Sequence, residues 1–190
     1  MKTLIYLHGY NSSPLSHKAQ LTTQYMGKYH PSVQCLLPQL SFAPAKAIEQ
    51  ITQLMDTIDD PVIIGSSLGG YYANFFVEQY GCKAVLVNPA VYPDHLLEAY
   101  LGPQSNDYTG ETYTLTKQHM VELRALAVAR MTEPEKRMLM IQTADETLDF
   151  SEATQFYRAS RSIIEHGGDH SFIGYDQWLP AIADFLALSR

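Results

Sequence analysis

The stretch that decides the fold reads VIIGSSLGG and occupies residues 62–70. Its apolar residues predict a short buried strand, and the residues that follow Ser67 have the pattern of a helix up to Tyr80. Gly65 and Gly69 flank the serine in a Gly-x-Ser-x-Gly arrangement. In a sharp strand-to-helix turn, the nucleophile elbow, this pattern holds a serine hydroxyl clear of the strand end, because glycines avoid collisions there. Ser67 is the predicted nucleophile; the alternative is a glycine-rich connection in which Ser67 only caps the helix.

Short apolar runs alternate with longer helical patterns along the rest of the chain. Predicted strands occupy residues 3–7, 33–37, 62–64, 84–87, 138–142 and 161–164, and predicted helices occupy residues 17–29, 45–58, 68–80, 149–159 and 178–188. Most strand runs are continuously apolar, which is typical of parallel strands covered on both faces. The alternation predicts an α/β fold with a mostly parallel sheet of about six strands flanked by helices. Functional groups are then expected beyond the carboxyl ends of the strands.

The segment between the fourth and fifth predicted strands breaks this alternation. It holds no convincing strand, and a polar stretch over residues 102–111 precedes a helical pattern over residues 116–131. Since no repeat or linker occurs, we predict a single domain over residues 1–190 with a cap-like insertion at about 89–135. The insertion leaves the sheet at the edge that carries Ser67, so its apolar side chains either line an acyl pocket or only pack the insertion onto the sheet. These side chains are Tyr92, Leu96, Leu97, Tyr100, Tyr108, Tyr113 and Leu115.

A serine hydroxyl needs a base, and two of the histidines, His166 and His170, follow the last predicted strand. His170 lies in the loop GGDHSF of residues 167–172, before the last predicted helix. In sheets that carry such an elbow, the serine, the acid and the histidine occur in that chain order. His170 is therefore the predicted base, and the alternative is a surface histidine. The nearby His166 ends a strand and is expected to be structural.

A carboxylate has to orient the imidazole through its second nitrogen. Asp145, Glu146 and Asp149 all follow the fifth predicted strand. Asp145 comes first in the loop and is the predicted acid, whereas Asp149 opens a helix with the spacing of a capping box and is better explained as its cap. Asp169 is adjacent to His170 in sequence, and adjacent side chains rarely point at each other.

A tetrahedral intermediate needs backbone N–H groups that bind its negative oxygen. Leu68, directly after the nucleophile, supplies one of them. The second is expected from the loop after the first strand, which reads HGYNSS over residues 8–13. Gly9 permits a close approach there and Tyr10 supplies the amide. His8 is expected to be a buried hydrogen-bonding residue that shapes the loop, rather than a second base or a metal ligand.

Composition and motifs also narrow the possible partners. The chain of 190 residues has a net charge of −7 and no block of Lys or Arg, which argues against nucleic acid and an anionic membrane as partners. No phosphate- or dinucleotide-binding glycine motif occurs, so we expect no organic cofactor. His166 and His170 have the spacing of a metal-ligand pair on a helix, but the two glycines between them disfavour a helix, so we expect no metal. The two cysteines are expected to be reduced. The N-terminus lacks the features of a signal peptide, so we expect a cytoplasmic protein that acts on a small molecule.

Three stretches together resemble the YqiA-like bacterial esterases, which are small α/β hydrolases. They are LHGYNSSP over residues 7–14, GSSLGG over residues 65–70 and GDHSF over residues 168–172. The resemblance implies a parallel sheet without the first strands of larger superfamily members, and a serine esterase that hydrolyses small carboxylic esters or acyl thioesters. The family pattern of an Asp-Glu pair followed by Leu-Asp matches residues 145–149 and supports Asp145 as the acid. Phe is usual at the position of Tyr10, a mild departure that leaves a backbone role undisturbed.

Two other functions are compatible with the same residues. One is a catalytically weak binding protein that has kept the fold, although the presence of serine, histidine and aspartate together favours an enzyme. The other is a peptidase or acyltransferase that uses the same triad, since a fold alone does not separate these reactions.

Overall fold

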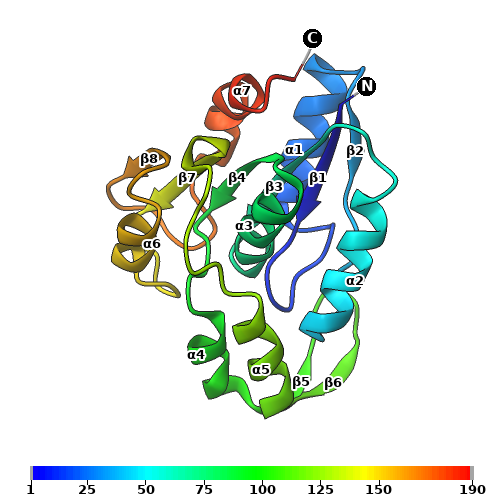
Figure 1. Cartoon of the computed structure of the whole chain (residues 1–190), viewed down its shortest axis with the longest axis vertical. Helices are drawn as coiled ribbons and strands as arrows, with labels where there is room; N and C mark the ends of the chain where they lie inside the picture. Colours follow the sequence, from blue (N-terminus) through cyan, green and yellow to red (C-terminus); the bar gives the residue numbers. More distant parts are fainter. Residues whose placement is uncertain (1, 189–190) are drawn as a thin grey trace.

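The computed structural model describes residues 2–188 and contains a six-stranded sheet whose strands all run parallel. The strands are β1 (Thr3–Leu7), β2 (Gln34–Leu36), β3 (Pro61–Ser66), β4 (Lys83–Val87), β7 (Arg137–Gln142) and β8 (Arg161–Glu165). Their order is β2-β1-β3-β4-β7-β8 (Figure 1). The chain passes from β1 to β2 and then returns to place β3 on the other side of β1. Ligand crevices form at such reversals, beyond the carboxyl ends of the strands.

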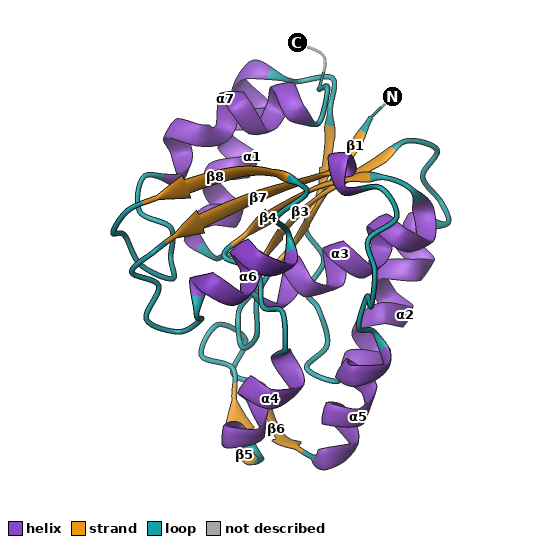
Figure 2. Ribbon diagram, turned by 60° about the vertical axis from the view of Figure 1, so that its left-hand side comes forward, coloured by secondary structure: helices purple, strands orange, loops and turns teal. Residues whose placement is uncertain are grey.

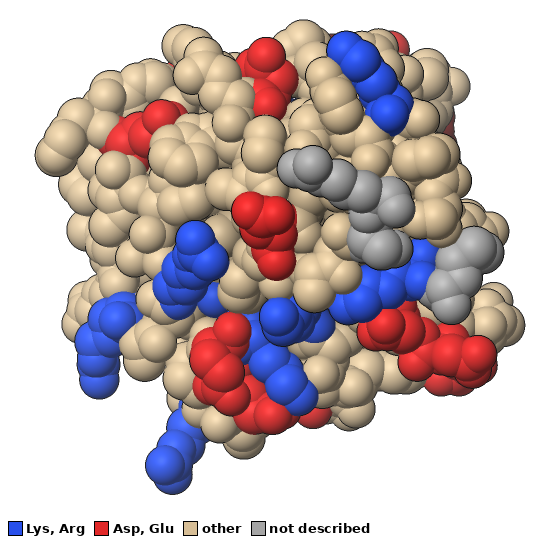
Figure 3. Space-filling model, turned by 90° about the horizontal axis from the view of Figure 1, so that it is seen from above, with Lys and Arg blue, Asp and Glu red and all other residues tan. Residues whose placement is uncertain are grey.

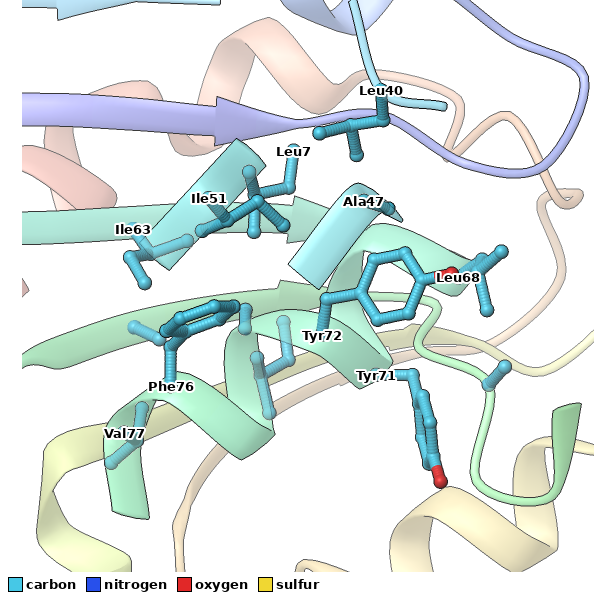
Figure 4. Packing of buried hydrophobic residues seen from close by; sticks show 14 of the residues in the cluster. Leu7, Leu40, Ala47, Ile51, Ile63, Leu68, Tyr71, Tyr72, Phe76 and Val77 are labelled. Carbon is cyan, nitrogen blue, oxygen red and sulfur yellow. The ribbon is translucent and has the colours of Figure 1, made fainter. Parts of the chain in front are cut away.

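Helices cover both faces of this sheet (Figure 2). They are α1 (His17–Tyr29), α2 (Pro44–Met55), α3 (Leu68–Tyr80), α6 (Phe150–Phe156) and α7 (Tyr175–Phe185). Because alternate strand residues point to opposite faces, Leu4 and Ile64 pack with α1 and α7, whereas Ile5 and Ile63 pack with α2 and α3. Figure 4 shows part of this second layer, between α3 and the sheet. Burial on both faces explains why the four central strands, β1, β3, β4 and β7, read as mostly continuous apolar runs.

The predicted α/β architecture is confirmed, and each predicted strand and helix overlaps an observed one. Several predicted helices end too late: the helices predicted to end at residues 58, 131, 159 and 188 end at Met55, Ala125, Phe156 and Phe185. In addition, α7 begins at Tyr175 rather than at Trp178. Tyr175 and Leu179 are both buried against the layer formed with α1, and this packing starts the helix earlier. Pro180 consequently lies inside the helix and not in its first turn.

Between β4 and β7 the prediction that no strand occurs is wrong. The segment contains α4 (Pro93–Leu97), an antiparallel hairpin of β5 (Gly102–Ser105) and β6 (Thr112–Leu115), helix α5 (Lys117–Ala125), and the 3-10 turns Glu98–Tyr100 and Pro134–Lys136. The β5 sequence GPQS has no apolar alternation, so pairing with β6, not a local pattern, makes it a strand. These elements extend beyond the carboxyl end of the sheet (Figure 1). They make up the cap-like insertion, whose membership of a single domain with the sheet remains a prediction.

Charged side chains are mixed on the face of the molecule seen in Figure 3, which lies at the end where the strands begin. Acidic and basic side chains lie next to one another there, instead of gathering in patches of one sign. That face therefore presents no broad basic surface. Within residues 2–188, no helix combines the length and apolar character that crossing a membrane requires.

Candidate active site

Ser67 occupies a sharp turn between β3 and α3. Its φ of 56° lies in the left-handed region that side-chain-bearing residues seldom adopt, and its N–H donates to the Val87 carbonyl oxygen at 3.0 Å. The turn is possible because of its glycines: a Cβ on Gly69 would lie 2.0 Å from the Leu7 carbonyl oxygen, and one on Gly65 would lie 2.3 Å from the Gly69 oxygen. The observed turn therefore has the geometry of a nucleophile elbow.

A chain of hydrogen bonds connects Ser67 to His170 and Asp145. The Ser67 Oγ lies 3.1 Å from His170 Nε2, and His170 Nδ1 lies 2.8 Å from Asp145 Oδ2 and 3.0 Å from its Oδ1. A carboxylate can only accept hydrogen bonds, so Nδ1 carries the proton and Nε2 is free to accept the serine hydroxyl proton. The structure thus brings together the three predicted triad residues, which lie in loops after β3, β7 and β8.

The Asp145 side chain is buried, with 3% of its area exposed. Burial opposes ionisation, but hydrogen bonds from His170 and from the Leu148 and Thr147 N–H groups outweigh it and lower the pKa of the carboxyl. Both N–H groups donate to Asp145 Oδ1, at 2.9 Å and 2.8 Å. Asp145 is therefore a fixed carboxylate that keeps the imidazole in one orientation.

The other acidic candidates have different partners. Asp149 caps α6, since its Oδ1 accepts the Ser151 N–H at 2.8 Å. Glu146 Oε2 accepts the His170 N–H at 3.0 Å, so it supports the histidine's backbone and not its ring. Asp169 accepts a hydrogen bond from the Ser171 hydroxyl. His166 is exposed directly after β8.

Two residues that the sequence analysis missed hold the loop of His170. Asn88 Nδ2 donates to the carbonyl oxygens of Asp169 and His170 at 3.1 and 3.3 Å, and its Oδ1 accepts the Gln142 N–H at 3.0 Å. Gln142 Oε1 accepts the Asp169 N–H at 3.1 Å, and a Cβ on Gly168 would lie only 2.0 Å from that oxygen. The sequence feature that could have identified both residues is the position of a polar residue at the carboxyl end of a buried strand, β4 for Asn88 and β7 for Gln142.

The loop after β1 runs directly against the nucleophile. A Cβ on Gly9 would lie 3.1 Å from Ser67 Cβ. His8 is buried, as predicted; its Nδ1–H donates to the Gly9 carbonyl at 2.8 Å and its Nε2 accepts the Leu40 N–H at 3.0 Å. Burial lowers the pKa of His8, which favours this neutral form. The loop is thus fixed where Tyr10 is expected to supply an oxyanion-binding N–H, and that role remains a prediction.

Leu68 is the first residue of α3, so its N–H has no acceptor within the helix. The N–H groups of Gly70 and Tyr71 are engaged in the turn, because both donate to the Ser67 carbonyl, at 2.9 and 3.3 Å. Leu68 follows the nucleophile directly, at the position expected for an oxyanion donor. This assignment, like that of Tyr10, stays a prediction.

The insertion contacts the same loop through its hairpin. The Tyr113 hydroxyl of β6 donates to Asn11 Oδ1, and Asn106 Nδ2 donates to the Ser12 carbonyl at 3.0 Å. The Tyr113 ring stacks on Phe42, with centroids 4.0 Å apart. Asn11 itself has a φ of 47°, in the left-handed region that Asn adopts more readily than most residues. The hairpin of β5 and β6 therefore supports the loop after β1.

A cavity of about 320 Å³ opens beside Ser67 and His170. The insertion contributes only Tyr108 to its lining. Of the two alternatives for the apolar side chains of the insertion, Leu97 and Leu115 fit the packing role, since both are buried in the hydrophobic core. The full lining is Tyr6, His8, Gly9, Tyr10, Asn11, Ser12, Ser16, His17, Lys18, Ser66, Ser67, Tyr108, His170 and Ser171.

Metal ligands are not grouped in the part of the chain that the structure describes. Residues 2–188 contain no cluster of three or more His, Cys, Asp or Glu side chains that could hold an ion. Cys35 and Cys82 are both free thiols, and burial raises the pKa of Cys82 to about 11. The candidate site therefore consists of the triad, the loop after β1 and the cavity.

This parallel sheet, with its elbow after β3 and its acid and histidine loops after β7 and β8, defines the α/β-hydrolase fold. A putative hydrolase from Agrobacterium vitis has a similar structure, with a TM-score of 0.77 and 20% identity over 97% of this chain and 88% of that chain. An esterase from Pyrococcus furiosus has a TM-score of 0.66 and 17% identity over 98% of this chain and 81% of that chain. At these identities the likeness shows the fold.

The chain belongs to the uncharacterised protein family UPF0227, whose model matches residues 3–187. A UPF0227 protein of Vibrio parahaemolyticus is 23% identical over 186 residues, which cover 96% of this chain and 98% of that protein. The resemblance to YqiA-like proteins that the sequence motifs indicated is thereby confirmed, while the esterase activity that it implied is a separate question.

Proposed function

We propose that this protein is a serine esterase that hydrolyses small carboxylic esters or acyl thioesters through an acyl-enzyme on Ser67. The observation that carries the proposal is the hydrogen-bond chain from Asp145 through His170 to Ser67, with contacts of 2.8 and 3.1 Å. It ends on a serine held at positive φ at the reversal point of the sheet. The names of the structurally similar hydrolase and esterase support the same reaction class.

The geometry supports a two-step reaction. Ser67 Oγ attacks the substrate carbonyl carbon while His170 Nε2 takes the hydroxyl proton, and Asp145 stabilises the imidazolium that forms. The Leu68 and Tyr10 N–H groups bind the resulting oxyanion. When the intermediate collapses, the bond to the alcohol or thiol breaks, and that group leaves with the proton from His170. Water then attacks the acyl-enzyme with His170 again as base, which releases the acid and restores the Ser67 hydroxyl.

A fluorophosphonate probe tests the nucleophile directly. It should label Ser67 in the wild-type protein, and Ser67→Ala should lose both the label and ester hydrolysis, with kcat falling by about 10⁵- to 10⁶-fold. The neighbouring variant Ser66→Ala is the matched control and should keep its label. Label found on Ser66, or undiminished hydrolysis by Ser67→Ala, would overturn the assignment. Labelling without turnover of any ester or thioester would instead favour a peptidase or an acyltransferase.

A further inference from the structure

The cavity beside the nucleophile is bounded on one side by the first turn of α1. Ser16, His17 and Lys18 all line it, together with Ser67 and His170. The Lys18 ammonium donates to the Ser171 carbonyl at 2.9 Å and lies 3.5 Å from the His170 carbonyl. A positive charge is thus held against the loop that carries the catalytic base.

Lys18 is the single Lys or Arg among the described residues that line this cavity. No ion pair within 4.0 Å joins it to a carboxylate in residues 2–188. Asp169 and Asp145 attract it from a greater distance, but Asp169 accepts from the Ser171 hydroxyl and Asp145 is occupied by His170. The ammonium is therefore bound by carbonyl groups without direct neutralisation of its charge.

Burial acts on this charge as well. Removal from water lowers the pKa of Lys18 to about 8, against the attraction of Asp169 and Asp145. A partly buried cation that lacks a direct counter-ion is stabilised by an anion that enters its site. The start of α1 adds to this effect, because a helix N-terminus favours negative charge and the first turn of α1 holds no acidic residue.

The rest of the lining combines aromatic surface with hydrogen-bonding groups. No aliphatic side chain and no Phe line the cavity among the described residues, and Tyr6, Tyr10 and Tyr108 provide its aromatic surface. Asn11, Ser12 and Ser16 add hydrogen-bonding groups that a long alkyl chain would desolvate without replacing their partners. A volume of about 320 Å³ suits a small ligand.

We propose that this cavity takes the short, anionic part of an ester or thioester substrate, and that Lys18 binds its carboxylate or phosphate while the scissile carbonyl lies at Ser67. The inference rests on the proposed function and specifies its substrate class. A charge-assisted hydrogen bond of this kind should favour a charged substrate over its neutral counterpart by about tenfold in kcat/KM.

The test compares two pairs of esters by their release of a coloured phenol. The first pair is 4-nitrophenyl hydrogen fumarate, whose trans double bond prevents self-cyclisation, and its methyl ester; the charge is on the acyl side. The second pair is the acetates of 2-nitrophenol with and without a ring carboxylate; the charge is on the leaving group. The pair with the larger charged-to-neutral ratio of kcat/KM identifies the side that faces Lys18.

Three variants separate charge from structure. Lys18→Gln keeps an N–H donor for the Ser171 carbonyl but has no charge, so the ratio should fall about tenfold. Lys18→Arg keeps the charge and should keep most of the preference. Lys28→Gln removes a fully exposed charge from the same helix and should change nothing. Because each ratio compares two substrates of one variant, a general loss of activity from a shifted His170 loop cancels.

The wild-type protein provides a test without substitution. Its preference should decline as the pH rises from 7 to 9, because Lys18 loses its proton near its pKa of about 8, whereas Lys18→Arg stays charged. The other titratable groups around the cavity are the same in wild type and in Lys18→Arg, so a decline that occurs only in the wild type belongs to Lys18. They are Tyr6, His8, Tyr10, His17, Tyr108, Asp145, Asp169 and His170.

The outcomes distinguish this inference from the proposed function. A ratio near one in the wild type, or an equal ratio in wild type and Lys18→Gln, overturns the anion preference while esterase activity stands. If Ser67 takes no label and neither ester of any pair is hydrolysed, the proposed function itself is wrong and the substrate class falls with it.

Discussion

The carboxyl edge of the sheet and the insertion after β4 hold their geometry in different ways. At the sheet edge, short loops follow β3, β4 and β7, which are buried on both faces, and β8; side chains at the ends of β4 and β7 bond to backbone groups of neighbouring segments. In the insertion, the elements are short and several aromatic rings are about half exposed, among them Tyr92, Tyr100 and Tyr108. The insertion bonds to the site through the loop after β1.

This difference indicates that the two regions have different roles in the site. The triad needs positions fixed to a fraction of an ångström, and rigid strands supply that precision. The insertion supports the loop after β1, which is predicted to present the Tyr10 N–H, and its hydrogen bonds reach that loop rather than the side chains of the triad. Substitutions at the sheet edge should therefore affect turnover far more than substitutions in the insertion.

The largest effect is expected at the acid. Asp145→Asn should lower kcat by about 10⁴-fold, because an amide in place of the carboxylate favours the wrong imidazole tautomer. The melting temperature and the access of the fluorophosphonate probe to Ser67 should change little, since the side-chain shape is kept. Asp149→Asn is the matched control and should keep its activity, because Asn also caps helices. If Asp149→Asn were the inactive variant, the acid would have been assigned to the wrong residue.

A smaller effect is expected at Asn88, which belongs to the sheet edge but touches no reacting atom. Asn88→Asp keeps the acceptor for the Gln142 N–H and replaces the donor to Asp169 and His170 by a carboxylate that repels their carbonyls. We expect kcat to fall by about 10- to 100-fold through misplacement of His170, with KM little changed. Steady-state kinetics measure this. A rise of KM at constant kcat would show that Asn88 has no part in positioning the base.

The smallest effect is expected in the insertion. Tyr113→Phe keeps the ring stacked on Phe42 and removes its hydrogen bond to Asn11, so kcat should fall by about three- to tenfold. Tyr100→Phe is the control, because its ring also packs near Tyr10 without this bond. Equal kinetics of Tyr113→Phe and wild type would mean that the loop keeps its conformation without the hairpin. A loss as large as that of Asp145→Asn would abolish the contrast between the two regions.

Local sequence was sufficient for the sheet and for the residues of the triad. A strand buried on both faces has to be apolar throughout, and an elbow has to have glycines where side chains would collide, so both leave a pattern within a few neighbouring residues. The order of Ser67, Asp145 and His170 along the chain then placed them at one edge, because parallel strands present all their carboxyl ends together.

The tertiary structure alone decided which distant side chains meet. The hairpin strand β5 has no apolar alternation and forms only by pairing with β6. Asn88 reaches the loop of His170, Tyr113 reaches Asn11 and Lys18 reaches Ser171, in each case across more than seventy residues of chain. Such contacts depend on how whole elements pack, and a polar residue carries no local mark of the partner it will meet. The residues of the candidate triad were therefore readable in the sequence, whereas the supports of its loops and the charge in its cavity emerged only from the packing of the folded chain.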